Sequence, residues 1–263
     1  MIFTIVILPI LSALFSGILG NYVGRLGSVH ITLFCMLLTT IISLFFLSQA
    51  TLLNEIYYFN GGSWMCTGGF IVNWGFIFDS ITMSMLSMIS IVSTVVHIYS
   101  GGYMSNDPHL SRFMSYLSMF TFFMFILVTS DNFIQLFLGW EGVGLCSYLL
   151  INFWYTRIQA NKSALKALII NRIGDFGLLI GILLIFLFFR SIDFETIFTL
   201  VPYFCHKTLI MGKYEIKVVL LITMFLFIGS VGKSAQFGLH VWLPDAMEGE
   251  RNLNEYLLKM KHN

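Results

Sequence analysis

The sequence predicts an all-α membrane protein with about seven transmembrane helices and a short hairpin after the second helix. Hydrophobic residues make up 57% of the 263 residues and charged residues only 10%, whereas soluble domains carry about 25% charged residues. About seven apolar stretches are long enough to cross roughly 30 Å of hydrocarbon, which takes about 20 helical residues. Because a surface with so few charges cannot face water, we expect the lipid bilayer to surround the chain.

The apolar stretches follow one another with short connections. They lie at about 1–23, 30–53, 77–103, 112–130, 132–155, 163–189 and 214–241. The first stretch lacks a basic region before its apolar run and has a poor cleavage pattern, which indicates a membrane helix and not a removable signal. We therefore divide the chain into a helix pair at 1–53, a hairpin loop at 54–76, a five-helix region at 77–249 and a charged tail at 250–263.

Two connections have a structure of their own. The segment NEIYYFNGGSWMCTGGFIVNWGFIFD follows the second stretch, alternates like a strand and is rich in Gly, Asn and aromatic residues. It predicts a short interfacial hairpin with its Trp and Tyr side chains at the depth of the lipid headgroups. Residues 191–200, SIDFETIFTL, predict a short amphipathic helix on the membrane surface.

Loop charges favour an N-terminus on the outer side of the membrane. The inner loops of that topology contain Arg25, Arg112, Arg157 and Lys162, whereas the first two outer loops contain neither Lys nor Arg. Basic residues collect on the inner side of membrane proteins. The loop near residues 190–217 contains both basic and acidic residues and breaks the pattern.

Composition also excludes some functions. A net charge of +1 without a basic cluster excludes a nucleic-acid-binding surface. Cys35, Cys66, Cys146 and Cys205 are scattered and form no CxxC pair. We therefore expect them to be small core residues, and not metal ligands or a disulfide framework.

Four charged residues lie well inside the predicted spans. Glu141 interrupts LFLGWEGVGLCSYLLINF in the fifth span, Arg172 and Asp175 lie in the sixth, and Lys233 lies in the seventh. A charge at the middle of a bilayer costs at least about 2.5–3.5 kcal/mol on insertion scales. These residues must therefore face one another, protein or water. Either they pair and fasten helices together, or they line a path for ions or protons, which we favour.

The spacing of these residues suggests how they work. Arg172 and Asp175 are three residues apart and can pair along one face of a helix. Glu141 and Lys233 have no opposite charge at helical spacing in their own spans, so each needs a partner on another helix or in trapped water. Burial favours the neutral form of both groups and pairing favours the charged form. A Glu and a Lys whose separation changes therefore form a proton switch.

The depths of the two residues predict an interruption in the last span. Glu141 lies roughly 13 Å into its helix, near the middle of the membrane, while Lys233 lies beyond the middle of a straight helix. Direct pairing needs a tilt, a later helix start or a break near Lys233. GSVGKSAQFG places glycines on both sides of Lys233, and Pro244 follows. Interrupted helices typically line ion sites in transporters.

Several other polar residues are secondary candidates. His97 is a possible proton relay, with a histidine at the membrane interface as the ordinary alternative. For His240, beside a tryptophan, the two interpretations are equally good. Lys166 lies about a turn inside the sixth span, from where it can reach the membrane surface or act as a relay. Asp79 and Asp131 flank spans and are typical of helix caps or loops.

Three long motifs make the family recognisable. They are MSYLSMFTFFMFILVTSDNFIQLFLGWEGVGLCSYLLINFWYTR, KALIINRIGDFGLLIGI and FIGSVGKSAQFGLHVWLPDAMEG. They resemble the chain 5 family of respiratory NADH:ubiquinone oxidoreductase (complex I). More broadly, they are similar to the antiporter-like subunits that complex I shares with multisubunit cation/proton antiporters. The resemblance runs from about residue 1 to residue 249.

The resemblance implies the first half of the antiporter-like fold and a proton-translocating subunit in the complex I membrane arm, beside other membrane-arm subunits. It implies the mitochondrial inner membrane, with a bacterial inner membrane as the alternative. No cofactor is expected in this chain, because NADH, FMN, iron–sulfur clusters and ubiquinone bind to partner subunits. Glu141 and Lys233 match the family's fifth-helix glutamate and seventh-helix lysine, which exchange protons, and Arg172 and Asp175 match positions near that path.

The sequence departs from the family pattern after DAMEG. The family continues there with a Pro-Thr-Pro turn and at least seven further spans, whereas Glu250 begins a charged tail here. We therefore expect a truncated chain, or one of two polypeptides that together complete the fold. Two other functions stay open: a structural fragment that does not pump, and a subunit of a cation/proton antiporter.

Overall fold

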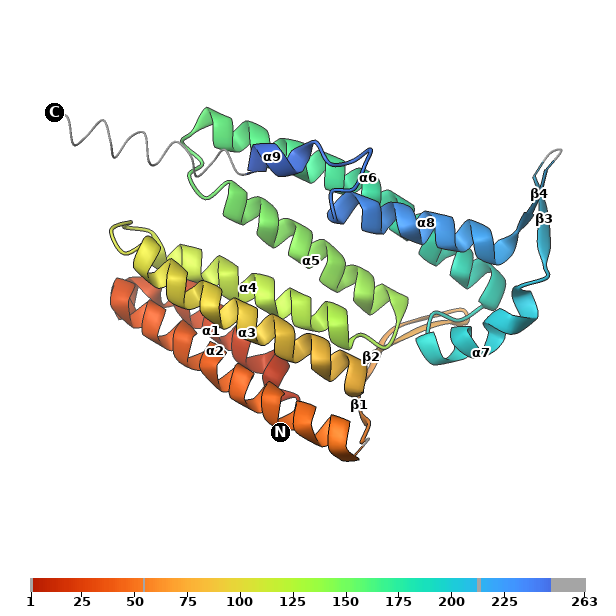
Figure 1. Cartoon of the computed structure of the whole chain (residues 1–263), viewed down its shortest axis with the longest axis horizontal. Coiled ribbons are helices and arrows are strands. Elements are labelled where there is room, and N and C mark those ends of the chain that lie inside the picture. Colours follow the sequence, from red (N-terminus) through yellow and green to blue (C-terminus); the bar gives the residue numbers. More distant parts are fainter. Residues whose placement is uncertain (1, 54, 212–213, 247–263) are drawn as a thin grey trace. The chain divides into compact units, whose positions relative to one another are not determined.

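The computed structural model describes residues 2–53, 55–211 and 214–246, which are mostly helical (Figure 1). The elements in chain order are α1 (Thr4–Ile18), α2 (Gly20–Leu53), β1 (Tyr57–Thr67), β2 (Phe70–Phe78), α3 (Ser80–Tyr103), α4 (Leu110–Thr129), α5 (Phe133–Ile151), α6 (Ile158–Phe189), α7 (Phe194–Phe204), β3 (Thr208–Met211), β4 (Tyr214–Lys217), α8 (Val218–Lys233) and α9 (Trp242–Ala246). The chain forms two compact units, Met1–Trp64 with Asn73–Cys146 and Met65–Val72 with Ser147–Asn263.

The first unit is a bundle in which α1 packs against α2 and α4, and α2 and α4 both pack against α3. Its interior is rich in Ser and Thr, whose hydroxyls mostly donate to backbone carbonyls one turn earlier in the same helix. A few hydroxyls join different helices: those of Ser43 and Ser90 lie 2.8 Å apart, and Ser115 Oγ donates to the Ala13 carbonyl at 2.8 Å. Such bonds suit hydrocarbon surroundings, where every polar group must find its partner inside the protein.

The outer surface of the helices is apolar, as expected for a protein in lipid. Large side chains such as Phe34, Ile98, Phe176 and Phe227 are more than half exposed. Five helices, α2 to α6, are long and apolar enough to cross a membrane, and α1 and α8 are shorter apolar helices of 15 and 16 residues. The all-α membrane fold is therefore confirmed, and the count of seven spans stays a prediction.

Several predicted boundaries were wrong for local reasons. The second helix begins at Gly20 and not near residue 30, with Gly24 as a kink at φ 78°. α3 begins at Ser80 because Asp79 caps it, accepting a 2.7 Å hydrogen bond from the Thr82 amide. The predicted span 214–241 is instead a strand followed by α8 alone, because Tyr214–Lys217 pairs with Thr208–Met211 in a hairpin that the sequence did not predict.

The hairpin expected at 54–76 is present as the two-stranded sheet β1–β2, and its depth in the membrane stays a prediction. Polar contacts join it to the turn between α4 and α5. Tyr58 donates to Asp131 at 2.9 Å, and the Gly75 amide donates to Gln135 Oε1 at 3.2 Å. Asp131 is thus a loop residue as predicted, but it is buried. Any larger residue at position 75 would displace the Asp131 carboxylate, since a Cβ there would lie 1.6 Å from Asp131 Oδ2.

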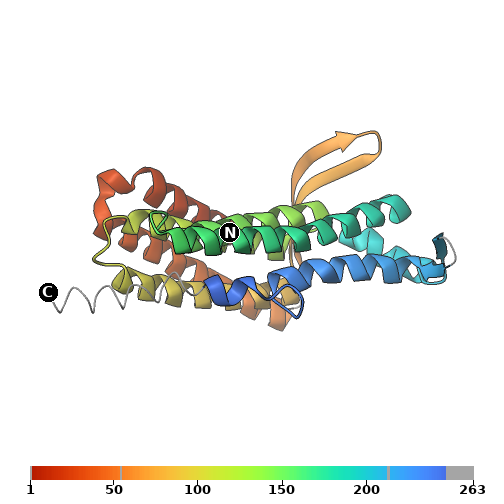
Figure 2. The ribbon, with the colours of Figure 1, turned by 90° about the horizontal axis from the view of Figure 1, so that it is seen from above.

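In the second unit, α6 and α8 run side by side (Figures 1 and 2). The short helix expected near 191–200 is α7, and its place on the membrane surface stays a prediction. The tip of the first hairpin belongs to this unit, where Phe70 packs edge-on against Phe186 with ring centres 5.0 Å apart. The charged tail predicted at 250–263 lies outside the described residues.

Candidate functional site

In the second unit, α6 and α8 approach each other closely. Gly174, Gly177 and Gly181 on α6 meet α8, which contributes Gly229 and Gly232. A Cβ on Gly232 would lie 3.0 Å from the Gly174 Cα atom, so the two backbones touch there. Small residues commonly permit such contacts between membrane helices.

The predicted interruption after Lys233 is confirmed. α8 ends at Lys233, and α9 begins only at Trp242. Between them, Ala235 has φ 51° and Gly238 has φ 104°, conformations that turn the chain away from the helix axis. The Trp242 indole donates to the Gly232 carbonyl at 3.2 Å. This bond satisfies an oxygen of the last helical turn, which a helix end otherwise leaves without a helical partner.

Two of the predicted charged residues lie next to the contact between α6 and α8. Asp175 follows Gly174 and Lys233 follows Gly232, so each lies one residue beyond the contact between the two backbones. Asp175 is only 6% exposed and Lys233 is half-buried. Arg172 is exposed, so it does not share the burial of Asp175, although the two lie on one helix. The charge of Lys233 sits in the last turn of α8, where the helix dipole favours a cation.

Glu141 lies in the part of α5 that belongs to the first unit, roughly 12 Å from the start of the helix. It is half-buried. The small residues around it bring α4 close: Cβ atoms on Gly139 and Gly142 would lie 2.7 Å from the Leu127 amide nitrogen and 2.2 Å from the Phe123 ring. Since Glu141 and Lys233 belong to different units, their pairing stays a prediction.

His97 is fully buried between α3 and α4, which the sequence did not predict. Its Nδ1 lies 2.7 Å from the Ser93 carbonyl and therefore carries a proton, while Nε2 lies 3.2 Å from Ser118 Oγ. The Ser118 hydroxyl has a second acceptor, the Met114 carbonyl at 3.0 Å. When the ring is neutral, its Nε2 accepts a hydrogen bond from the Ser118 hydroxyl. When the ring is charged, its Nε2 donates to Ser118 Oγ, and the Ser118 hydroxyl donates to the Met114 carbonyl. Both protonation states of His97 are therefore hydrogen-bonded.

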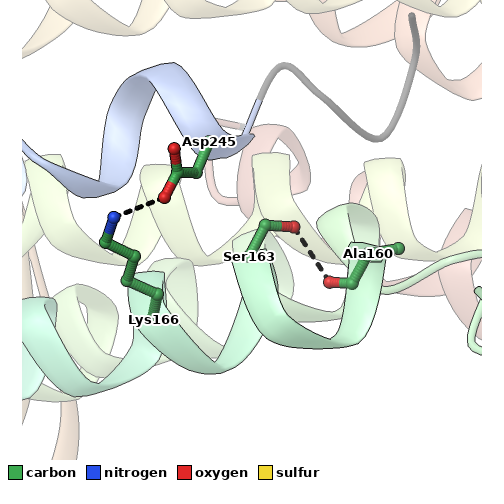
Figure 3. A network of polar contacts seen from close by, with 4 residues as sticks. All are labelled: Ala160, Ser163, Lys166 and Asp245. Carbon is green, nitrogen blue, oxygen red and sulfur yellow. Dashed lines mark hydrogen bonds and ion pairs between the residues drawn. The ribbon is translucent and has the colours of Figure 1, made fainter. Parts of the chain in front are cut away.

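The other two secondary candidates belong to the second unit. His240 is exposed in the turn before α9, with its ring stacked on Phe237 at 6.2 Å. Lys166 forms an ion pair with Asp245 of α9 and does not simply extend to a membrane surface (Figure 3). The sequence did not predict this partner, because only the turn after Lys233 carries Asp245 back to α6.

No group of three or more His, Cys, Asp and Glu residues that could hold a metal ion occurs in the described part of the chain. The four cysteines are free thiols. Cys146 is a buried core residue as expected, whereas Cys66 is exposed on β1, which corrects the prediction for that residue. The absence of cofactors from this chain stays a prediction.

Comparison with known proteins agrees with these features. Two family models match: "NADH:quinone oxidoreductase/Mrp antiporter, TM" over residues 130–259, and "NADH-Ubiquinone oxidoreductase (complex I), chain 5 N-terminus" over residues 64–114. Among solved structures, the Mrp complex from Dietzia sp. DQ12-45-1b has a TM-score of 0.77 at 21% identity, over 94% of this chain and 25% of that chain. The archaeal membrane-bound sulfane sulfur reductase has a TM-score of 0.75 at 17% identity, over 92% and 46%. These structures share the fold.

Curated relatives are much more similar in sequence. NADH-ubiquinone oxidoreductase chain 5 of Dictyostelium discoideum is 55% identical over 243 residues, which are 92% of this chain and 36% of the relative. The protein of the same name from Chondrus crispus is 56% identical, over 93% of this chain and 37% of the relative. That of Arabidopsis thaliana is 51% identical, over 93% and 36%. The chain thus spans little more than a third of the length of these relatives.

The apolar helices, the shared fold and the matching family model define an antiporter-like, multi-pass helical membrane protein. Within that class, the chain belongs to the NADH-ubiquinone oxidoreductase chain 5 family. It is a protein of the mitochondrial inner membrane, in keeping with its eukaryotic relatives and its apolar helices.

Proposed function

We propose that this chain is a proton-translocating part of the membrane arm of respiratory complex I, coupling electron transfer from NADH to ubiquinone to proton movement. The observation that carries the proposal is the α6–α8 crossing, where Asp175 and Lys233 directly follow the touching Gly174 and Gly232 at the break in α8. An acid and a base beside an interrupted helix are the arrangement that transporters use for ions and protons.

In this proposal Glu141, Asp175 and Lys233 exchange protons along the path. Asp175 and the negative end of the α8 dipole favour a charged Lys233, and loss of the negative charge on Asp175 favours release of the lysine proton. Arg172, three residues earlier on the same helix, stabilises the charged form of Asp175 in this proposal. His97, His240 and Lys166 are secondary relay positions, of which His97 has the hydrogen bonds to accept either protonation state.

The proposal assigns the redox chemistry to other subunits. NADH, FMN, the iron–sulfur clusters and ubiquinone bind there, and this chain contributes ionisable side chains in a membrane. The relatives named above are nearly three times as long as the matched part. We propose that this part works with the remaining length of such relatives, on the same polypeptide or on a second one, and with the other membrane-arm subunits.

Replacing Glu141 with Gln in the assembled enzyme tests the proposal. The amide keeps the size of the side chain but cannot carry a proton, so we expect proton pumping and coupled turnover to fall by about tenfold or more. Glu195→Gln is the matched control, since Glu195 is exposed in α7 and outside the proposed path. Unchanged pumping and turnover in a fully assembled Glu141→Gln enzyme would refute the proton role.

The family description that also names the Mrp antiporter supports a second candidate, a cation/proton antiporter subunit. Proton flux measured in vesicles with and without NADH distinguishes the two functions. Cation-driven proton flux without NADH favours the antiporter. Proton flux that appears only after NADH is added favours complex I. A chain that never co-purifies with particles of complex I size would instead be a structural fragment without a pumping role.

A further inference from the structure

The segment that follows Lys233 is tied back to the bundle of the second unit at both ends of α9. At its first residue, the Trp242 indole bonds to the Gly232 carbonyl of α8. Near its last residue, the Asp245 carboxylate pairs with Lys166 of α6 (Figure 3). α9 therefore packs against α6 while remaining attached to the end of α8.

Lys166 supplies the polar contact from α6 to α9 in this region. Ser163, one turn earlier on the same helix, donates its proton within α6, to the Ala160 carbonyl at 2.9 Å (Figure 3). The side chains of Lys166 and Asp245 are each about one-third exposed, at 37% and 35%. Because both side chains are partly exposed, the attraction between their charges gives a modest preference for the docked position of α9.

The turn between Lys233 and α9 is short and contains a strained residue. Ala235 adopts φ 51°, which is unfavourable for a residue with a Cβ and is kept only where the surroundings impose it. Its amide reaches the Gly232 carbonyl at 3.4 Å, and the Gln236 amide reaches the Val231 carbonyl at 3.1 Å. Because both ends of the turn are attached, the position of α9 determines the course of the chain that leaves Lys233.

We propose that Lys166 and Asp245 form an ion-pair latch that docks α9 on α6 and thereby positions Lys233 at the α6–α8 crossing. Lys166 and Asp245 act as positioning residues in this latch. Opening the latch releases residues 234–241 and loosens the end of α8. The part of this inference that concerns Lys233 rests on the proposed proton path, whereas the latch itself does not.

Cysteine labelling measures the latch directly. Cys35, Cys66, Cys146 and Cys205 are replaced with Ser, and Gln236→Cys, an exposed position in the turn, is labelled with a maleimide in the assembled enzyme. The label on this chain is measured after the subunits are separated. We expect Asp245→Asn and Lys166→Gln to speed labelling about two- to fivefold, the shift that a partly exposed ion pair can account for.

The exchanged pair Lys166→Asp with Asp245→Lys is the decisive variant, because it restores the attraction with neither original side chain. The exchanged pair should return the labelling rate toward that of the original pair. Asp245→Glu keeps the charge and should change the labelling rate less than Asp245→Asn does. Glu215→Gln, which removes an exposed carboxylate from β4, is the control and should leave the rate unchanged. Equal rates in all variants, or no recovery in the exchanged pair, overturn the latch.

Proton pumping in the same variants tests the positioning of Lys233. We expect pumping to fall in the two single variants and to recover in the exchanged pair, at equal amounts of assembled enzyme. Faster labelling with unchanged pumping would keep the latch but overturn its role in positioning Lys233. Failure of the proposed function is seen separately, as unchanged pumping in Glu141→Gln.

Discussion

Two residues other than glycine adopt positive φ in the described chain, and both lie where a helix ends. Arg190, at φ 56°, ends α6, and Ala235, at φ 51°, follows α8. The glycines around Lys233 predicted a break, and Gly238 has a positive φ, but so does Ala235, whereas Gly232 stays helical in contact with Gly174. The residue types predicted that the chain turns here, but not which residue adopts the strained left-handed conformation.

Arg190→Gly should stabilise the protein by about 0.5–1 kcal/mol. Glycine removes the steric cost of the left-handed conformation at the end of α6, and the gain is partly offset by the greater freedom of glycine in the unfolded chain. Thermal unfolding of the purified protein in detergent measures the change. Arg190→Ala is the control, since it removes the charge but keeps the strain. Equal unfolding temperatures for the two variants would contradict this explanation.

At the scale of elements, glycine spacing determines which helices meet closely. Gly174, Gly177 and Gly181 recur at helical spacing on α6, and Gly229 and Gly232 do so on α8. Such spacing in an apolar helix is typical of a close helix contact. In the sequence, the glycines near Lys233 predict a break but do not show that α8 pairs with α6. That pairing is a property of two distant segments and has no local signal.

Gly177→Ala should destabilise the protein by about 1–3 kcal/mol, the usual cost of overpacking. Its Cβ would lie 2.7 Å from Ile228 Cγ2 and 2.9 Å from Ile228 Cβ, so the two helices would have to separate. Gly102→Ala is the matched control: Gly102 is helical and has no atom within 4 Å of the added Cβ. The control should raise stability by up to about 1 kcal/mol through helix propensity, giving shifts of opposite sign in thermal unfolding.

At the scale of the whole molecule, the apolar surface determines the surroundings of the chain, and loop charge determines its expected orientation. In the part of the chain that the structure describes, five helices are long and apolar enough to cross a membrane. The charge pattern of the loops predicts an outer N-terminus and an outer β1–β2 hairpin. Orientation depends on the membrane and not on contacts within the protein, so it is tested in the membrane.

Cys66 reports the orientation, because it is exposed on the hairpin. With Cys35 and Cys205 replaced by Ser, a membrane-impermeant maleimide added to intact mitoplasts should label Cys66 from the intermembrane side. Buried Cys146 should stay unlabelled until the protein is unfolded and serves as the internal control. Labelling that requires access from the matrix side would reverse the topology.

The sequence alone determined the membrane class, most of the helices, the first hairpin, the break after Lys233 and the family, because hydropathy, glycine content and long motifs are local properties of a chain. Four features became known only from the tertiary structure. They are the contact between the glycines of α6 and α8, the burial of His97 against Ser118, the second hairpin and the pairing of Lys166 with Asp245. Each of these joins groups from different elements, or strands too short to leave a periodic pattern. Such partners are determined by close packing, and packing depends on which distant segments of the chain lie next to each other in the fold.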